Sequence, residues 1–129
     1  MRRDMDLIRA LLLKIESMEI KPGYTTRALQ ASDPDLQVGS YTEDQIGYHL
    51  EYLIDSKLVD GSCSVDRLFH IYKLTQDGHN FVDSVRDPEI WRKTKDGAQK
   101  AGGFTLELLS DLAKGLIKTQ IEKHTGVKL

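Results

Sequence analysis

The sequence predicts an α+β fold in which helices outnumber strands. Apolar residues recur at helical spacing in several segments, first in residues 4–18. Strand-forming apolar residues stand on both sides of the turn signal Asp60-Gly61, in residues 58–59 and 68–74. A chain of 129 residues with 40% hydrophobic and 29% charged residues has the composition of one ordinary globular domain. A chain of this length can fold without disulfides or a metal ion.

Residues 4–18 form the first predicted helix. Asp4 and Asp6 suit the positive end of a helix dipole. The residues that follow at steps of one, three and four are apolar and share one face: Leu7, Ile8, Leu11, Leu12, Ile15 and Met18. The Lys-Pro-Gly sequence of residues 21–23 ends this helix.

The next segment, residues 24–41, is the least regular. Asp33-Pro34-Asp35 is a turn signal, and the apolar residues after it alternate with Gln37 and Gly39. We therefore predict two short strands here. One turn of helix over residues 26–31 is the alternative.

Residues 42–56 form the most clearly marked helix. Thr42 and Gln45 have the T-x-x-Q spacing of a capping box. One face is apolar and carries Ile46, Leu50, Leu53 and Ile54. At about 100° per residue, the opposite face carries Asp44, Tyr48, Glu51, Tyr52 and Asp55.

The chain then predicts a β-hairpin and a helix. The strand of residues 68–74 has apolar residues on both alternating sides, so we expect both of its faces to be covered. Cys63 would lie at the tip of the hairpin. Thr75 then caps a helix that extends to Val85.

Two further helices follow. Asp87 as N-cap and Pro88 at the first helical position predict a helix over residues 86–101. Gly102-Gly103 breaks the chain before a helix over residues 105–123. The apolar side of this last helix consists of Leu106, Leu109, Leu112, Ala113, Leu116, Ile117 and Ile121.

The order of these elements is that of a winged helix, a helix-turn-helix variant with a two-stranded wing. Residues 46–59 (IGYHLEYLIDSKLV) resemble the recognition helix and following strand of winged-helix regulators, and residues 72–78 (YKLTQDG) resemble the end of their wing. Residues 24–41 depart from that pattern, because strand-like residues stand where a second helix is expected. We expect a winged-helix-like domain over residues 1–85, with residues 86–129 as a C-terminal helical extension packed on the same domain.

A narrower resemblance covers nearly the whole chain. It is carried by residues 2–9 (RRDMDLIR), 41–50 (YTEDQIGYHL), 78–81 (GHNF) and 86–91. These segments are similar to those of a family of small bacterial and prophage proteins known only as a domain of unknown function. The resemblance implies the fold and a phage-related origin. Because the family has no established activity, it implies no catalytic or binding residue.

The sequence predicts no enzyme. Cys63 has no histidine near it in the sequence, and a single cysteine excludes disulfide frameworks and multi-cysteine zinc sites. His79 and Asp83 could share a metal ion, but two ligands do not make a site, and a surface hydrogen bond is the alternative. His49 flanks an apolar stripe and is interpreted as a partly buried, hydrogen-bonded side chain. We therefore expect no catalytic residue, cofactor or metal.

The charge distribution favours a protein partner. Residues 31–66 contain eight carboxylates and one base, Lys57. The outward face of the helix over residues 42–56 presents two tyrosines among acids, and tyrosine is enriched in protein interfaces. A solvated acidic face is the alternative interpretation. The five residues of this face, Asp44, Tyr48, Glu51, Tyr52 and Asp55, are the predicted partner-binding candidates.

We therefore expect a non-enzymatic regulatory or adaptor module that binds a protein or a second copy of itself as a homodimer. The alternative is a DNA-binding transcriptional regulator, which rests on analogy with the fold and is disfavoured by the acidic helix. The candidates for nucleic-acid contact are Arg2, Arg3, Arg92, Lys93, Lys95 and Lys100. The absence of a long apolar run or a signal-peptide core predicts a cytoplasmic protein with no membrane association.

Overall fold

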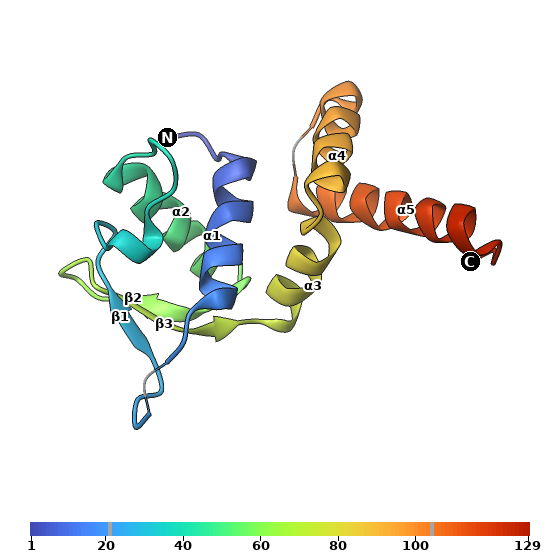
Figure 1. Cartoon of the computed structure of the whole chain (residues 1–129). Helices are drawn as coiled ribbons and strands as arrows, with labels where there is room; N and C mark the ends of the chain where they lie inside the picture. Colours follow the sequence, from blue (N-terminus) through green and yellow to red (C-terminus); the bar gives the residue numbers. More distant parts are fainter. Residues whose placement is uncertain (21, 104) are drawn as a thin grey trace. The chain divides into compact units, whose positions relative to one another are not determined.

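The structure, a computed structural model, describes residues 1–20, 22–103 and 105–129, so Lys21 in the predicted helix-ending turn lies outside the described residues. The described residues form an α+β fold with five α-helices and a small three-stranded antiparallel sheet (Figure 1). The chain divides into two compact units, Met1–His79 and Asn80–Leu129. Docking of residues 86–129 on the first domain stays a prediction.

Helix α1 (Met5–Ser17) supplies much of the core of the first unit. The carboxylate of Asp4 caps it by accepting a hydrogen bond from the Leu7 N–H at 3.2 Å. The helix packs against α2 (Glu43–Asp55) and β3 (Phe69–Leu74). Its buried residues are Met5, Leu7, Ile8, Leu11, Leu12 and Ile15. The predicted first helix is therefore confirmed, and burial of each large aliphatic side chain contributes about 1.5 to 3 kcal/mol.

Only one of the two strands predicted in residues 24–41 forms. Strand β1 (Arg27–Leu29) pairs antiparallel with β3, so the alternative of a helical turn there is wrong. The second predicted strand is also wrong, because Pro34–Leu36 form a short 3-10 helix, η1. The Asp33 carboxylate starts η1 by accepting a hydrogen bond from the Asp35 N–H at 2.9 Å. Leu36 is completely buried in this turn, so an apolar residue belongs at this position although no strand forms.

Strand β2 (Val59–Cys63) pairs antiparallel with β3, and the sheet order is β1-β3-β2. The turn predicted at Asp60-Gly61 is wrong: these residues lie within β2, at a shift in its register with β3. A Cβ at Gly61 would lie 2.5 Å from the His70 carbonyl oxygen, so the glycine permits a close approach of two strands. Cys63 is the last residue of β2, and the hairpin turns beyond it.

Only one side of β3 is well covered. Phe69, Ile71 and Leu74 are buried, whereas Tyr72 is 41% exposed and Lys73 is exposed. The expectation that both faces are covered is therefore wrong. An antiparallel sheet needs an apolar cover on one face only, and the apolar body of a tyrosine tolerates water on the other.

The helices of the C-terminal half begin where their caps predict, and the last one extends two residues beyond its predicted end. Thr75 caps α3 (Gln76–Val85), within which the boundary of the two units falls. Asp87 caps α4 (Pro88–Ala101). Thr105 caps α5 (Leu106–Thr125).

Helices α4 and α5 pack together in the second unit. The predicted apolar side of α5 is only partly covered: Leu109 and Ala113 are buried and Ile121 is 42% exposed. No helix in the described part of the chain is long and apolar enough to cross a membrane.

Candidate functional site

The outward face of α2 is the candidate site, and local hydrogen bonds fix where this helix begins. The Gln45 N–H donates to the Thr42 hydroxyl at 3.2 Å, and the Thr42 N–H donates to the Gln45 side-chain oxygen at 2.9 Å. The predicted capping box is confirmed. Ile46, Leu50 and Leu53 are fully buried on the inner face. The rotation of the helix is thus set, and the polar face lies outward.

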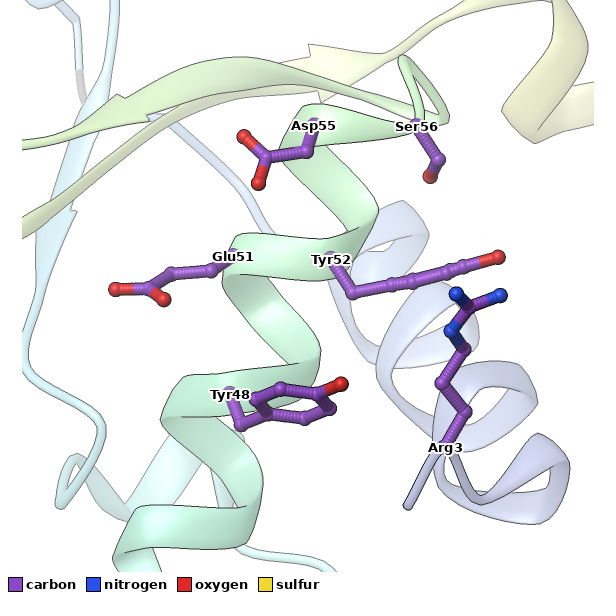
Figure 2. A pocket seen from close by; sticks show the side chains of 6 residues that line it. All are labelled: Arg3, Tyr48, Glu51, Tyr52, Asp55 and Ser56. Carbon is purple, nitrogen blue, oxygen red and sulfur yellow. The ribbon is translucent and has the colours of Figure 1, made fainter. Parts of the chain in front are cut away.

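A pocket of about 390 Å³ lies on this face (Figure 2). Tyr48, Glu51, Tyr52 and Asp55, four of the five predicted partner-binding residues, line it together with Ser56 and Arg3. Asp44 lies elsewhere. It lines a separate hollow of about 290 Å³ with residues of the β2–β3 hairpin. The predicted face is therefore mostly one continuous site.

The two tyrosines of the pocket have one cation beside them. The guanidinium carbon of Arg3 lies 4.7 Å from the centroid of the Tyr52 ring, within the range of a cation–π contact. Figure 2 shows the Arg3 side chain alongside the Tyr52 ring, with Tyr48 one turn away on α2. Arg3, a predicted candidate for nucleic-acid contact, thus lies beside the predicted candidates for protein contact.

The two carboxylates of the pocket differ in their partners. Glu51 forms an ion pair with Arg67 of the β2–β3 hairpin. Asp55 is exposed, and within the described ranges no ion pair reaches it. The pocket thus contains one compensated carboxylate and one that is free to bind a cation.

A buried histidine fixes the segment that carries Arg3. His49 is 1% exposed; its Nε2 accepts from the Asp4 backbone N–H at 2.8 Å, and its Nδ1 donates to the Gln45 carbonyl at 2.7 Å. Both bonds require the neutral ring protonated on Nδ1. The prediction of a hydrogen-bonded histidine is confirmed, although the ring is fully rather than partly buried.

The carboxylate of Asp4 adds a second link to the same region. Its Oδ2 accepts a hydrogen bond from the Tyr41 hydroxyl at 2.7 Å. Burial, then this bond and the nearby charges of Asp4 and Asp6, raise the pKa of Tyr41 to about 12. The chain before α1 is therefore attached to the middle of α2 through its backbone and to the residue before the cap of α2 through a side chain.

The remaining candidates for nucleic-acid contact lie in both units, Arg2 in the first and the others in the second. Arg92 pairs with Glu89 and, at 3.4 Å, with Asp96, and the hydrogen bond between Arg92 and Glu89 lowers the pKa of Glu89. The Lys95 ammonium lies 5.7 Å from the centroid of the Trp91 ring. The other three candidates are exposed: Arg2 in the first unit, and Lys93 and Lys100 in the second.

The other residues considered from the sequence have separate partners. Cys63 is half-buried, and its thiol donates to the Ser64 carbonyl at 3.5 Å. His79 lies 4.0 Å from Glu16, and Asp83 pairs with Arg86 at 3.0 Å, so His79 and Asp83 have different partners. Over the residues that the structure describes, no group of three potential ligands could hold a metal ion.

A larger hollow of about 750 Å³ surrounds β1. It is lined by polar and apolar residues of the β1 region and by His70 of β3. Its base, Arg27, is already paired with Asp35. This hollow also contains a tyrosine, Tyr24, and a carboxylate, Glu19. The α2 pocket remains the candidate because four of the five predicted partner-binding residues line it.

Comparisons with known proteins identify relatives but no activity. Residues 2–104 match a family described as "Hypothetical protein (DUF2513)". An "Uncharacterized protein" of Haemophilus influenzae is 26% identical over 125 residues, which cover 94% of this chain and 99% of that protein. No solved structure matches the chain. The matched region contains every residue of the α2 pocket.

Proposed function

The chain belongs to the DUF2513 family of hypothetical proteins, and on that premise we propose that it is a non-enzymatic regulatory or adaptor module that binds another protein through the outward face of α2. The description of the family names no activity, so the proposal rests on the residues themselves. A second copy of the chain is one partner that the proposal allows. The cytoplasmic location and the phage-related origin stay predictions.

The observation that carries the proposal is the pocket formed by Tyr48, Tyr52, Asp55 and Arg3. Both tyrosines are half-buried, so each offers an apolar ring that no core element covers completely. Tyrosine and arginine are the residue types that most often contribute strongly to protein binding. Because the two tyrosines and Arg3 lie together on the outer side of a rigid, capped helix, an interaction surface is favoured over a merely solvated face.

A winged-helix-like architecture for the first unit makes the outward face of α2 the expected contact surface, whichever partner it binds. The element order α1, β1, α2, β2, β3 and the sheet order β1-β3-β2 agree with that architecture. The short η1 stands in the place of its second helix. In DNA-binding proteins of this type, the helix corresponding to α2 enters the major groove.

DNA binding is the alternative function, and the chemistry of α2 disfavours it. The helix contains no Arg or Lys, the residues that most often read guanine, and its four carboxylates would face phosphates. Arg67 of the adjacent hairpin is paired with Glu51, which reduces its availability to a phosphate. The alternative therefore rests on fold analogy alone.

The proposal can be tested with a photo-crosslinking amino acid at position 48 or 52 of the full chain in its native host cell. We expect the same protein adduct from both positions, and a weaker adduct from position 52 when Tyr48→Ala is also introduced. Positions 24 and 72 are matched controls, because Tyr24 and Tyr72 are 69% and 41% exposed and lie off α2. Equal adducts at the control positions, or adducts to nucleic acid, would contradict the proposal.

A further inference from the structure

We propose that the α2 pocket binds an arginine side chain of the partner protein and that Arg3, which lines the pocket at the Tyr52 ring, competes for that ring. This inference rests on the protein-binding function proposed above and specifies the chemistry of the partner. The partner class is a protein segment with an exposed arginine, and nucleic acid is excluded from it.

The position of Arg3 shows that the pocket accepts a guanidinium. Its guanidinium carbon lies 4.7 Å from the Tyr52 ring centroid. Arg3 is exposed and precedes α1, in a stretch that forms no helix or strand. No ion pair involving Arg3 occurs among the described residues, so the Tyr52 ring is its principal contact. One contact of this kind at an exposed site is weak enough for another cation to displace it.

The spacing of the pocket residues suits an incoming arginine. Tyr48, Tyr52 and Asp55 stand at i, i+4 and i+7 along one face of α2. Asp55 has no cation paired with it in the part of the chain that the structure describes. A guanidinium can stack on an aromatic ring and also donate to a carboxylate, whereas an ammonium group lacks the plane needed for stacking. Arg3 uses the ring alone, so the carboxylate remains available.

The surroundings provide charge complementarity and space. Residues 31–66, which include α2, contain eight carboxylates and one base. An acidic surface of this kind attracts basic segments and repels the phosphates of nucleic acids. The pocket volume of about 390 Å³ lies in the range of sites that hold small ligands or side chains.

The test uses nuclear magnetic resonance of the full chain with three probes: the N-acetyl amides of arginine, lysine and citrulline. Because a single side chain binds weakly, each probe is titrated into the millimolar range. We expect the arginine probe to shift the amide signals of Tyr48, Tyr52 and Asp55, the lysine probe to shift them less, and neutral citrulline to leave them unchanged.

Variants separate competition from general charge effects. Arg3→Ala should raise the affinity for the arginine probe about two- to fivefold, the strength of an exposed cation–π contact. Arg2→Ala is the matched control and should leave the affinity unchanged. Asp55→Asn should weaken binding, whereas Asp44→Asn, on the same helix but outside the pocket, should have a smaller effect.

A second pair of variants tests the ring. Tyr52→Phe should keep binding and Tyr52→Leu should abolish it. Tyr72→Leu, which removes another tyrosine ring with a nearby cation, is the control. An unchanged amide spectrum outside α2 shows that each variant is folded.

Three results would overturn the inference: citrulline that binds as well as arginine, Arg3→Ala that leaves the affinity unchanged or lowers it, or duplex DNA that shifts the same signals more strongly. The inference alone fails if crosslinks from positions 48 and 52 reach a protein but the arginine probe does not bind. The proposed function fails if the probe binds and no protein crosslinks.

Discussion

Removing the hydroxyl of Tyr41 should lower stability at neutral pH, and this loss should shrink as the pH rises through the alkaline range. In the folded protein this hydroxyl donates to Asp4 at 2.7 Å, and the pKa of Tyr41 is raised to about 12. Burial is the largest cause of this rise, so the shift mainly reflects how unfavourable the ionised ring is in the folded protein. The hydrogen bond of the neutral hydroxyl contributes about 1 kcal/mol. Tyr41→Phe should therefore cost about 1 kcal/mol near neutral pH.

The sign of the pH dependence follows from the direction of the shift. A folded-state pKa above the unfolded value stabilises the protein fully below about pH 10, and this contribution disappears as pH rises to about 12. Lysines also titrate in this range, so the informative quantity is the difference between wild type and Tyr41→Phe. Urea unfolding of both proteins from neutral pH upward measures it. A difference that stays constant through that range would refute the assigned role of the hydrogen bond.

Three other predictions address the fold and the alternative function. Gly78→Ala should lower the melting temperature by several degrees, because its Cβ would lie 2.1 Å from the Leu58 carbonyl oxygen. Gly115→Ala, whose Cβ would have no atom within 4 Å, should raise the free energy of unfolding by up to about 1 kcal/mol. Thermal unfolding compares the two variants, and equal effects would contradict the close approach at Gly78. Deleting residues 104–129 should reduce stability or solubility, because α4 loses the helix it packs on; an unchanged melting temperature and monomeric state would argue against this. Binding to random duplex DNA should be weaker than about 10⁻⁴ to 10⁻⁶ M at physiological salt. Micromolar binding in a mobility-shift titration that depends on the α2 tyrosines, and not on the α4 bases, would reverse the order of the two functions.

The helices could be predicted because their signals are local. Thr42 and Gln45 are three residues apart, and the Asp87 carboxylate accepts a hydrogen bond from the Ile90 N–H. The start of each helix is therefore determined by residues within one turn of it. The match of residues 2–104 confirms the predicted resemblance to a family of unknown function. The periodicity of α2 likewise brought four of its five predicted face residues into one pocket.

The errors arose where distant residues decide the structure. Strand β1 exists because it pairs with β3, which lies far along the chain. Gly61 signals a turn by composition, but the close His70 carbonyl is what requires it. The position of Arg3 beside Tyr52 could not be predicted either, because it depends on the hydrogen bond between Asp4 and a histidine 45 residues away.

The two edges of the sheet have a consequence for how the protein can associate. Strand β1 has only three residues and carries Arg27, while β2 has five residues and carries the exposed Asp60. Short, charged or bulged edges resist the addition of another strand. Backbone pairing between molecules, the usual route to amyloid-like aggregates, is thus poorly supported in this sheet. Association through side chains on the helix faces is left as the favoured mode.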